Sequence, residues 1–175
     1  MFTRDVNTAV DYFFTHHASA AQPPAPKVSE AKIQQLYEAY KSVETSTMDD
    51  DSIEKFYQDL GVNSETDEVV LLISSYMQAE NIGEYTWPEF QKGCLALGVD
   101  SISGFKNKLS SLYNELQDTE KYRAMYKFTF SFASARNYKN VDKAIALALW
   151  ELFFGKKCKF LALWSTFLEE EKKGL

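Results

Sequence analysis

The stretch YRAMYKFTFSFASARNYKNVDKAIALALWELFFGKKCKFLALW, residues 122–164, carries an aromatic or large aliphatic side chain at nearly every second or third position. Its charged residues lie mainly between its apolar runs. A segment this apolar must pack in a core or bind a partner, because exposing it to water is costly. We therefore expect the fold to be organised around it.

The second half of this stretch predicts one helix. Asp142 can cap its start, apolar residues from Leu147 to Phe154 follow, and Gly155 suits the left-handed turn that closes many helices.

The first half of the stretch is ambiguous. Aromatic residues alternate there as in a strand, at Tyr126, Phe128, Phe130 and Phe132. A helical face fits the same segment, with members at Tyr122, Met125, Tyr126, Thr129, Phe130 and Ala133. Periodicity alone does not decide between the two.

The composition is that of a globular protein. Of 175 residues, 45% are hydrophobic and 15% are aromatic, which is enough for a substantial core and argues against disorder outside a short linker. The net charge of −6 argues against nucleic-acid binding, which needs clustered Lys and Arg, and favours a basic partner.

No apolar run approaches the roughly 20 residues that cross a bilayer, and the N-terminus lacks the order of a signal peptide. We therefore expect an intracellular protein, in the cytoplasm and/or nucleus, that does not bind membranes. Its two cysteines, Cys94 and Cys158, are expected to be reduced thiols.

Two segments resemble calcium-binding loops but lack ligands. If Met48 takes the apolar eighth position of the first loop, the places that require oxygen ligands lack a suitable set of residues. Ser52 then falls at the twelfth position, which requires a Glu. The second loop, 78–89, has Gly83, Tyr85 and Glu89 at the sixth, eighth and twelfth positions. It also has Gln78 at the first position and Ile82 at the fifth, so we expect no bound calcium. We interpret Asp49 to Asp51 as an N-cap and first-turn acids of a helix.

No catalytic constellation is evident. His16 and His17 lie in the Pro-rich linker expected at 15–29, and Cys94 lies within an apolar helix, where an inert buried thiol is expected. Residues 1–14 predict a short amphipathic helix.

Several runs together resemble the potentiating-neddylation domain of the defective-in-cullin-neddylation family. They are YKFTFSFA (126–133), AIALALWELFF (144–154), KFLALWSTFLEE (159–170) and EYTWPEFQKGCLALGVDSI (84–102). The resemblance covers most of residues 30–175 and implies an all-α fold, in which EF-hand-like helical pairs without calcium precede an aromatic-rich helical bundle. It implies that 126–132 is helical, that 1–14 is the last helix of a ubiquitin-associated module, and that the domain's C-terminal part lies beyond Leu175.

The resemblance also implies a function. The family is a non-catalytic scaffold that promotes transfer of a ubiquitin-like modifier to cullins and binds the N-acetylated N-terminal helix of the modifier's conjugating enzyme. No cofactor or metal is implied. The peptide pocket would be lined by Ile53, Tyr57, Val70, Ile73, Ser74, Met77, Tyr85, Phe132, Leu149 and Leu152.

Cullins are partners of the family, but its cullin-contacting segment is expected beyond Leu175. We therefore expect weak or absent stimulation of cullin modification by this chain alone. Two alternatives remain open: a calcium-responsive EF-hand module and a truncated product without activity.

Overall fold

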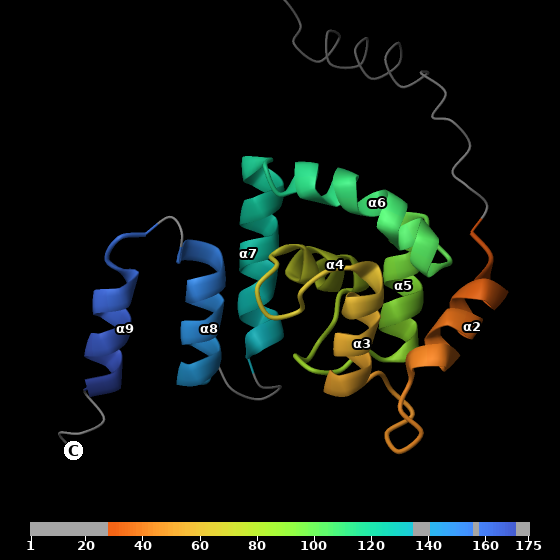
Figure 1. The fold of residues 1–175 in the computed structure, drawn as a ribbon, viewed down its shortest axis with the longest axis horizontal. Helices are drawn as coiled ribbons and strands as arrows, with labels where there is room; N and C mark the ends of the chain where they lie inside the picture. The colour runs from red at the N-terminus through yellow and green to blue at the C-terminus, as the bar shows by residue number, and fades with distance from the viewer. Residues whose placement is uncertain (1–27, 135–140, 156–157, 171–175) are drawn as a thin grey trace, which may run out of the picture.

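The computed structural model describes residues 28–134, 141–155 and 158–170 (Figure 1). Within them the chain forms helices and isolated β-bridges, with no named strand, which confirms the expected all-α fold class. The helices are α2 (Glu30–Tyr40), α3 (Asp50–Leu60), α4 (Val69–Met77), α5 (Trp87–Leu97), α6 (Ile102–Glu115), α7 (Thr119–Ala133), α8 (Lys143–Phe154) and α9 (Leu161–Glu170).

The helix expected at 1–14 and most of the linker expected at 15–29 lie outside the described residues. No helix in the described ranges has both the length and the apolar character that a membrane crossing requires.

The helices form two groups. Helices α2 to α5 pack around one core, with α6 lying along one side of it, and α7 packs on α4 (Figure 1). Helix α8 lies between α7 and α9, and α9 is the outermost helix at its end of the molecule (Figure 1). The aromatic stretch 122–164 therefore supplies most of α7, all of α8 and the start of α9.

Segment 126–132 is helical, which settles the ambiguous part of the sequence. Asp118 caps α7, its side chain accepting hydrogen bonds from the backbone N–H groups of Glu120 and Lys121 at 2.9 and 3.0 Å. The buried residues of α7 are Met125, Thr129, Phe132 and Ala133, which follow a helical period. The strand-like alternation arises because Tyr126 and Phe130 are 40% and 58% exposed on another face.

Phe56 is the centre of the core of α2 to α6. Its ring is fully buried and lies edge-on to four others, with centroid distances of 5.5 Å to Tyr40, 5.3 Å to Tyr57, 5.7 Å to Phe90 and 5.3 Å to Phe105. Such edge-to-face pairs add to the stabilisation from burial alone. Phe56 thus joins α2, α3, α5 and α6.

The loops before α3 and before α5 are joined by an antiparallel β-bridge. Met48 N–H donates to the Tyr85 carbonyl at 3.0 Å, and Tyr85 N–H donates to the Met48 carbonyl at 2.9 Å. The sequence analysis gave both residues the eighth position of a calcium-type loop, so the bridge supports the EF-hand-like pairing, which stays a prediction.

The carboxylate of Glu89, at the twelfth position of the second loop, is occupied by protein donors. Its Oε2 accepts from the Thr86 N–H and from Thr86 Oγ1, both at 2.7 Å, and its Oε1 accepts from the Glu80 N–H at 2.9 Å. This is the arrangement of a capping box. Glu89 thus stabilises the start of α5 and the turn before it.

One local expectation needs correction. Gly155 is right-handed, with φ −53° and ψ −37°, and its N–H donates to the Glu151 carbonyl in the helical pattern of α8. Ser29 precedes α2, and its side chain makes no capping bond. Helix α4 begins at Val69, after a turn in which Asn63 Oδ1 accepts from the N–H groups of Glu65 and Thr66.

The capping role predicts how the chain responds to Glu89→Ala and to calcium. We expect Glu89→Ala to lower the free energy of unfolding by about 1–2 kcal/mol, since donors at the start of α5 lose their acceptor. We expect calcium to leave the unfolding midpoint of the unsubstituted chain unchanged. Urea unfolding followed by circular dichroism measures both.

Glu44→Ala, in the exposed loop before α3, is the matched control and should cost much less. A calcium-dependent gain in stability that Glu89→Gln removes would contradict this account, because it would mean that Glu89 binds the ion.

Candidate peptide-binding site

The residues expected to line a peptide pocket meet at one core. They come from α3 (Ile53, Tyr57), α4 (Val70, Ile73, Ser74, Met77), the loop before α5 (Tyr85), α7 (Phe132) and α8 (Leu149, Leu152). The core itself contains Tyr57, Ile73, Met77, Tyr85 and Phe132, and the half-buried residues Ile53, Val70, Leu149 and Leu152 pack against it. Whether they bind a peptide stays a prediction.

Three buried hydroxyl groups form a chain inside this site. Tyr57 and Tyr85 are linked through their hydroxyl oxygens at 3.0 Å, and Tyr85 is linked to Ser74 Oγ at 2.6 Å. Ser74 Oγ in turn donates to the Val70 carbonyl at 2.9 Å. This chain of hydroxyl groups therefore connects α3, the loop before α5 and α4.

The chemistry of the groups fixes the direction of these hydrogen bonds. Burial raises the pKa of both tyrosine hydroxyls, so each keeps its proton and donates once. Because Ser74 donates to the Val70 carbonyl at 2.9 Å, it accepts from Tyr85, and Tyr85 accepts from Tyr57, whose hydroxyl also lies 3.5 Å from the Val70 carbonyl. No buried side-chain N or O atom among the described residues lacks a partner. The network supports the site and offers a ligand no unpaired group.

Close packing seals the inner wall of the site. Tyr57, Ile73, Ser74 and Met77 are fully buried, and a Cβ atom at Gly93 of α5 would collide with the side chain of Met77. Of the expected residues only Ile53, Val70, Leu149 and Leu152 are half-buried, so only they are open to a ligand, and we call these four residues the edge of the expected pocket. This edge carries no charge.

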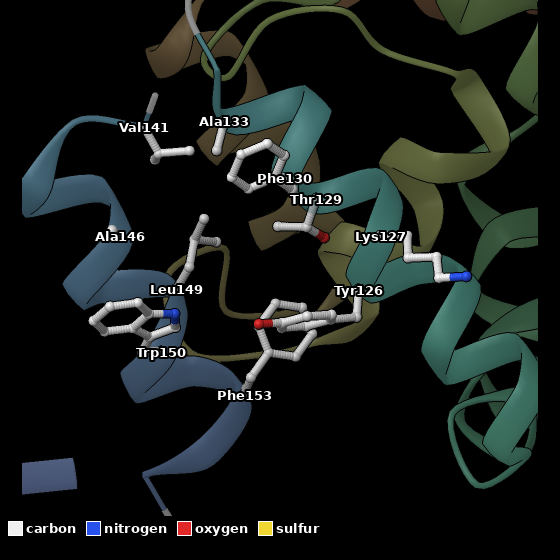
Figure 2. A pocket seen from close by; sticks show the side chains of 10 residues that line it. All are labelled: Tyr126, Lys127, Thr129, Phe130, Ala133, Val141, Ala146, Leu149, Trp150 and Phe153. Atoms are coloured by element: carbon white, nitrogen blue, oxygen red, sulfur yellow. The ribbon is translucent and has the colours of Figure 1, made fainter. Parts of the chain in front are cut away.

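An apolar cleft of about 430 Å³ lies between α7 and α8 (Figure 2). It is lined by Tyr126, Lys127, Thr129, Phe130, Ala133, Val141, Ala146, Leu149, Trp150 and Phe153. Figure 2 shows the Lys127 side chain pointing away from α8, so the cleft itself is apolar. Leu149 belongs both to the cleft and to the expected pocket.

The cleft was not predicted from the sequence. Tyr126 contacts Phe153 edge-on, with ring centroids 5.1 Å apart and planes at 77°, while Phe130 remains 58% exposed on the same side of α7. The strand-like alternation of aromatic residues was the available signal, because aromatic residues beyond those needed for one buried helical face must lie on a second face.

A more polar groove of about 540 Å³ lies between α4 and α7. On its wall Tyr76 donates to Glu115 Oε2 at 2.6 Å, and Lys121 Nζ lies 3.1 Å from the same oxygen. Burial alone would raise the pKa of Glu115, but these two partners lower it below its ordinary value, so the carboxylate stays charged. Phe128, also in the groove, stacks on Phe132 of the expected pocket with centroids 5.4 Å apart.

No group of three or more His, Cys, Asp or Glu residues in the described ranges is placed to hold a metal. Cys94 is fully buried, and burial, aided by the charge of Asp100, raises the pKa of its thiol to about 12. Such a thiol carries almost no reactive thiolate at neutral pH.

Comparison with known proteins agrees with the sequence resemblance. A family model described as cullin binding matches residues 104–175. DCN1-like protein 3 of Bos taurus is 31% identical over 92% of this chain and 55% of the relative, and that of Homo sapiens is 32% identical over 86% and 50%. Defective in cullin neddylation protein 1 of Caenorhabditis elegans is 27% identical over 90% of this chain and 55% of the relative.

The chain belongs to the defective-in-cullin-neddylation family. It spans about half the length of the curated relatives that it matches.

The hydroxyl chain predicts the effect of Tyr85→Phe. We expect a loss of about 1–2 kcal/mol in the free energy of unfolding, because the hydroxyl that joins Tyr57 to Ser74 disappears from a buried site. Tyr126→Phe, at a ring that is 40% exposed, is the matched control and should change stability by less than about 0.5 kcal/mol. Urea unfolding of both variants measures the difference.

The coupling is tested by combining Tyr85→Phe with Ser74→Ala. Because one hydrogen bond is shared, the double variant should lose less stability than the sum of the two single losses. Additive losses would contradict the hydrogen bond between Tyr85 and Ser74.

Proposed function

We propose that this chain acts in cullin neddylation as a scaffold that holds the modifier's conjugating enzyme by its N-acetylated N-terminal helix. The observation that carries the proposal is that Ile53, Val70, Leu149 and Leu152 are uncharged and half-buried against the core, while the other expected pocket residues are buried. A helix that inserts an apolar N-terminal residue fits such a surface.

The chemistry of the edge favours an acetylated terminus over a free amine. A free α-amino group is largely protonated at neutral pH, and its charge must be paired or remain in water. None of the expected pocket residues is acidic, so no partner for an ammonium group is present there. Acetylation removes the charge and makes burial of the terminal methionine favourable.

A scaffold role agrees with the state of Cys94 and with the family. Burial and a raised pKa make Cys94 a poor nucleophile, and the relatives are named for cullin neddylation rather than for a chemical step. A scaffold accelerates transfer by holding enzyme and substrate in one orientation, which converts an encounter into a step within one complex.

Cullins are the second partner in this proposal. The family model described as cullin binding matches residues 104–175, which include α7, α8 and α9.

Calorimetry with two peptides tests the proposal. Both are amphipathic helical peptides with the sequence of the conjugating enzyme's tail, one N-acetylated on methionine and one with a free amine. We expect the acetylated peptide to bind at least about tenfold more tightly, because burying an unpaired charge costs more than 1.4 kcal/mol.

Two substitutions locate the binding surface. Leu152→Ala, at the expected edge, should weaken the acetylated peptide, whereas Leu95→Ala, on an exposed part of α5, should not. Phe130→Ala changes the cleft but not the expected pocket. Equal binding of the two peptides would contradict the proposal, and so would loss of binding in Phe130→Ala but not in Leu152→Ala.

A further inference from the structure

Tyr122 of α7 contacts residues of the two helices that flank α7, which are α4 and α8 (Figure 1). Its hydroxyl donates to Oε1 of Glu68, the N-cap residue of α4, at 3.1 Å. Its ring lies edge-on to that of Phe153 in α8, with centroids 5.8 Å apart and planes at 87°. One half-buried side chain therefore joins α4, α7 and α8.

Both contacts lie next to residues of the expected pocket. Glu68 is two residues before Val70, and Phe153 directly follows Leu152. The Glu68 carbonyl accepts two N–H groups of the first turn of α4, and Phe153 is buried in the core, so both partners of Tyr122 belong to fixed parts of their helices. Tyr122 thus links the α4 side of the expected pocket to the α8 side.

The position of α8 relative to α4 depends on contacts that pass through α7, because α7 stands between them (Figure 1). Packing between α7 and α8 is incomplete, since the apolar cleft of about 430 Å³ separates them on one side of Phe153 (Figure 2). A gap removes the atoms that would oppose a small shift of one helix against the other. A directional hydrogen bond and an edge-on ring contact from the same side chain restrict that shift.

We infer that Tyr122 is a positioning residue of the expected pocket, which sets the distance between Val70 and Leu152 and thereby the affinity for the acetylated helical peptide. A site that already has its bound spacing loses less binding free energy to ordering. The inference rests on the proposed function for the identity of the ligand, whereas the spacing is a property of the free protein.

Tyr113 provides a matched comparison. Its hydroxyl donates to Asp67 Oδ2 at 2.5 Å, so it makes the same kind of bond to the residue next to Glu68. Tyr113 belongs to α6, and its bond therefore joins α6 rather than α7 to the start of α4. Loss of this bond should leave the position of α8 unchanged.

Double electron–electron resonance on the full chain measures the spacing. One spin label is attached to exposed Cys158, which follows α8, and one to a Gln58→Cys variant on the exposed surface of α3, while buried Cys94 stays unlabelled. We expect a narrow distance distribution that Tyr122→Phe broadens or shifts and that Tyr113→Phe leaves unchanged. Tyr122→Phe keeps the ring and removes only the hydroxyl.

Calorimetry with the acetylated peptide measures the consequence for binding. Tyr122→Phe and Glu68→Ala should each weaken the peptide about threefold to tenfold, which corresponds to one hydrogen bond. Glu68→Gln keeps an acceptor oxygen and should retain most of the affinity, and Tyr113→Phe should retain all of it. A merely structural role of Tyr122 would lower the free energy of unfolding without changing the affinity of the folded chain.

An unchanged distance distribution in Tyr122→Phe would overturn the inference. So would a peptide affinity that Tyr122→Phe leaves unchanged, or that Tyr113→Phe lowers as much as Tyr122→Phe does. If the unsubstituted chain does not bind the peptide while Tyr122→Phe still changes the spacing, the proposed function fails and the positioning role of Tyr122 stands.

Discussion

The two backbone hydrogen bonds between Met48 and Tyr85 hold together the parts on which the candidate site depends. Tyr85 is tied from several directions, since its carbonyl also accepts from the Tyr37 hydroxyl at 3.1 Å and its own hydroxyl links Tyr57 to Ser74. These bonds fix α2, α3 and α4 relative to the loop before α5. A bond in such a buried network is worth only about 1 kcal/mol net, but leaving its groups unpaired would cost considerably more. The network therefore holds the apolar residues of the site close together. The site needs no polar residue in contact with the ligand.

Much of the fold could be predicted, because its helices begin at residues whose side chains cap them. Asp49 and Asp142 accept N–H groups of the first turns of α3 and α8, as the sequence indicates. Predictions failed where a local rule competes with the surroundings. Gly155 can adopt a left-handed turn, but continued hydrogen bonding keeps the joint right-handed. Segment 126–132 has aromatic residues on two faces, so its period could not be assigned until α4 and α8 were seen on either side of it.

The candidate site was less accessible to sequence reasoning than the fold. Its residues came from family resemblance alone, because nothing in the spacing of Ile53, Val70 and Leu149 indicates that they pack on one core. The cleft between α7 and α8 depends on the distance between these two helices. The periodicity of the sequence does not encode that distance. The structure adds which of the expected residues are buried in the core and which remain half-buried. The half-buried residues are the ones that a ligand could contact and that substitution can test.

The central claim is that an acetylated methionine binds at the edge formed by Ile53, Val70 and Leu152. It is tested most directly by nuclear Overhauser contacts between a peptide carrying a 13C-labelled terminal methionine methyl group and the methyl groups of the protein. The account predicts contacts from that methyl group to Val70 and Leu152. Contacts to Val141 and Ala133 instead would place the methionine in the cleft between α7 and α8 and contradict the account.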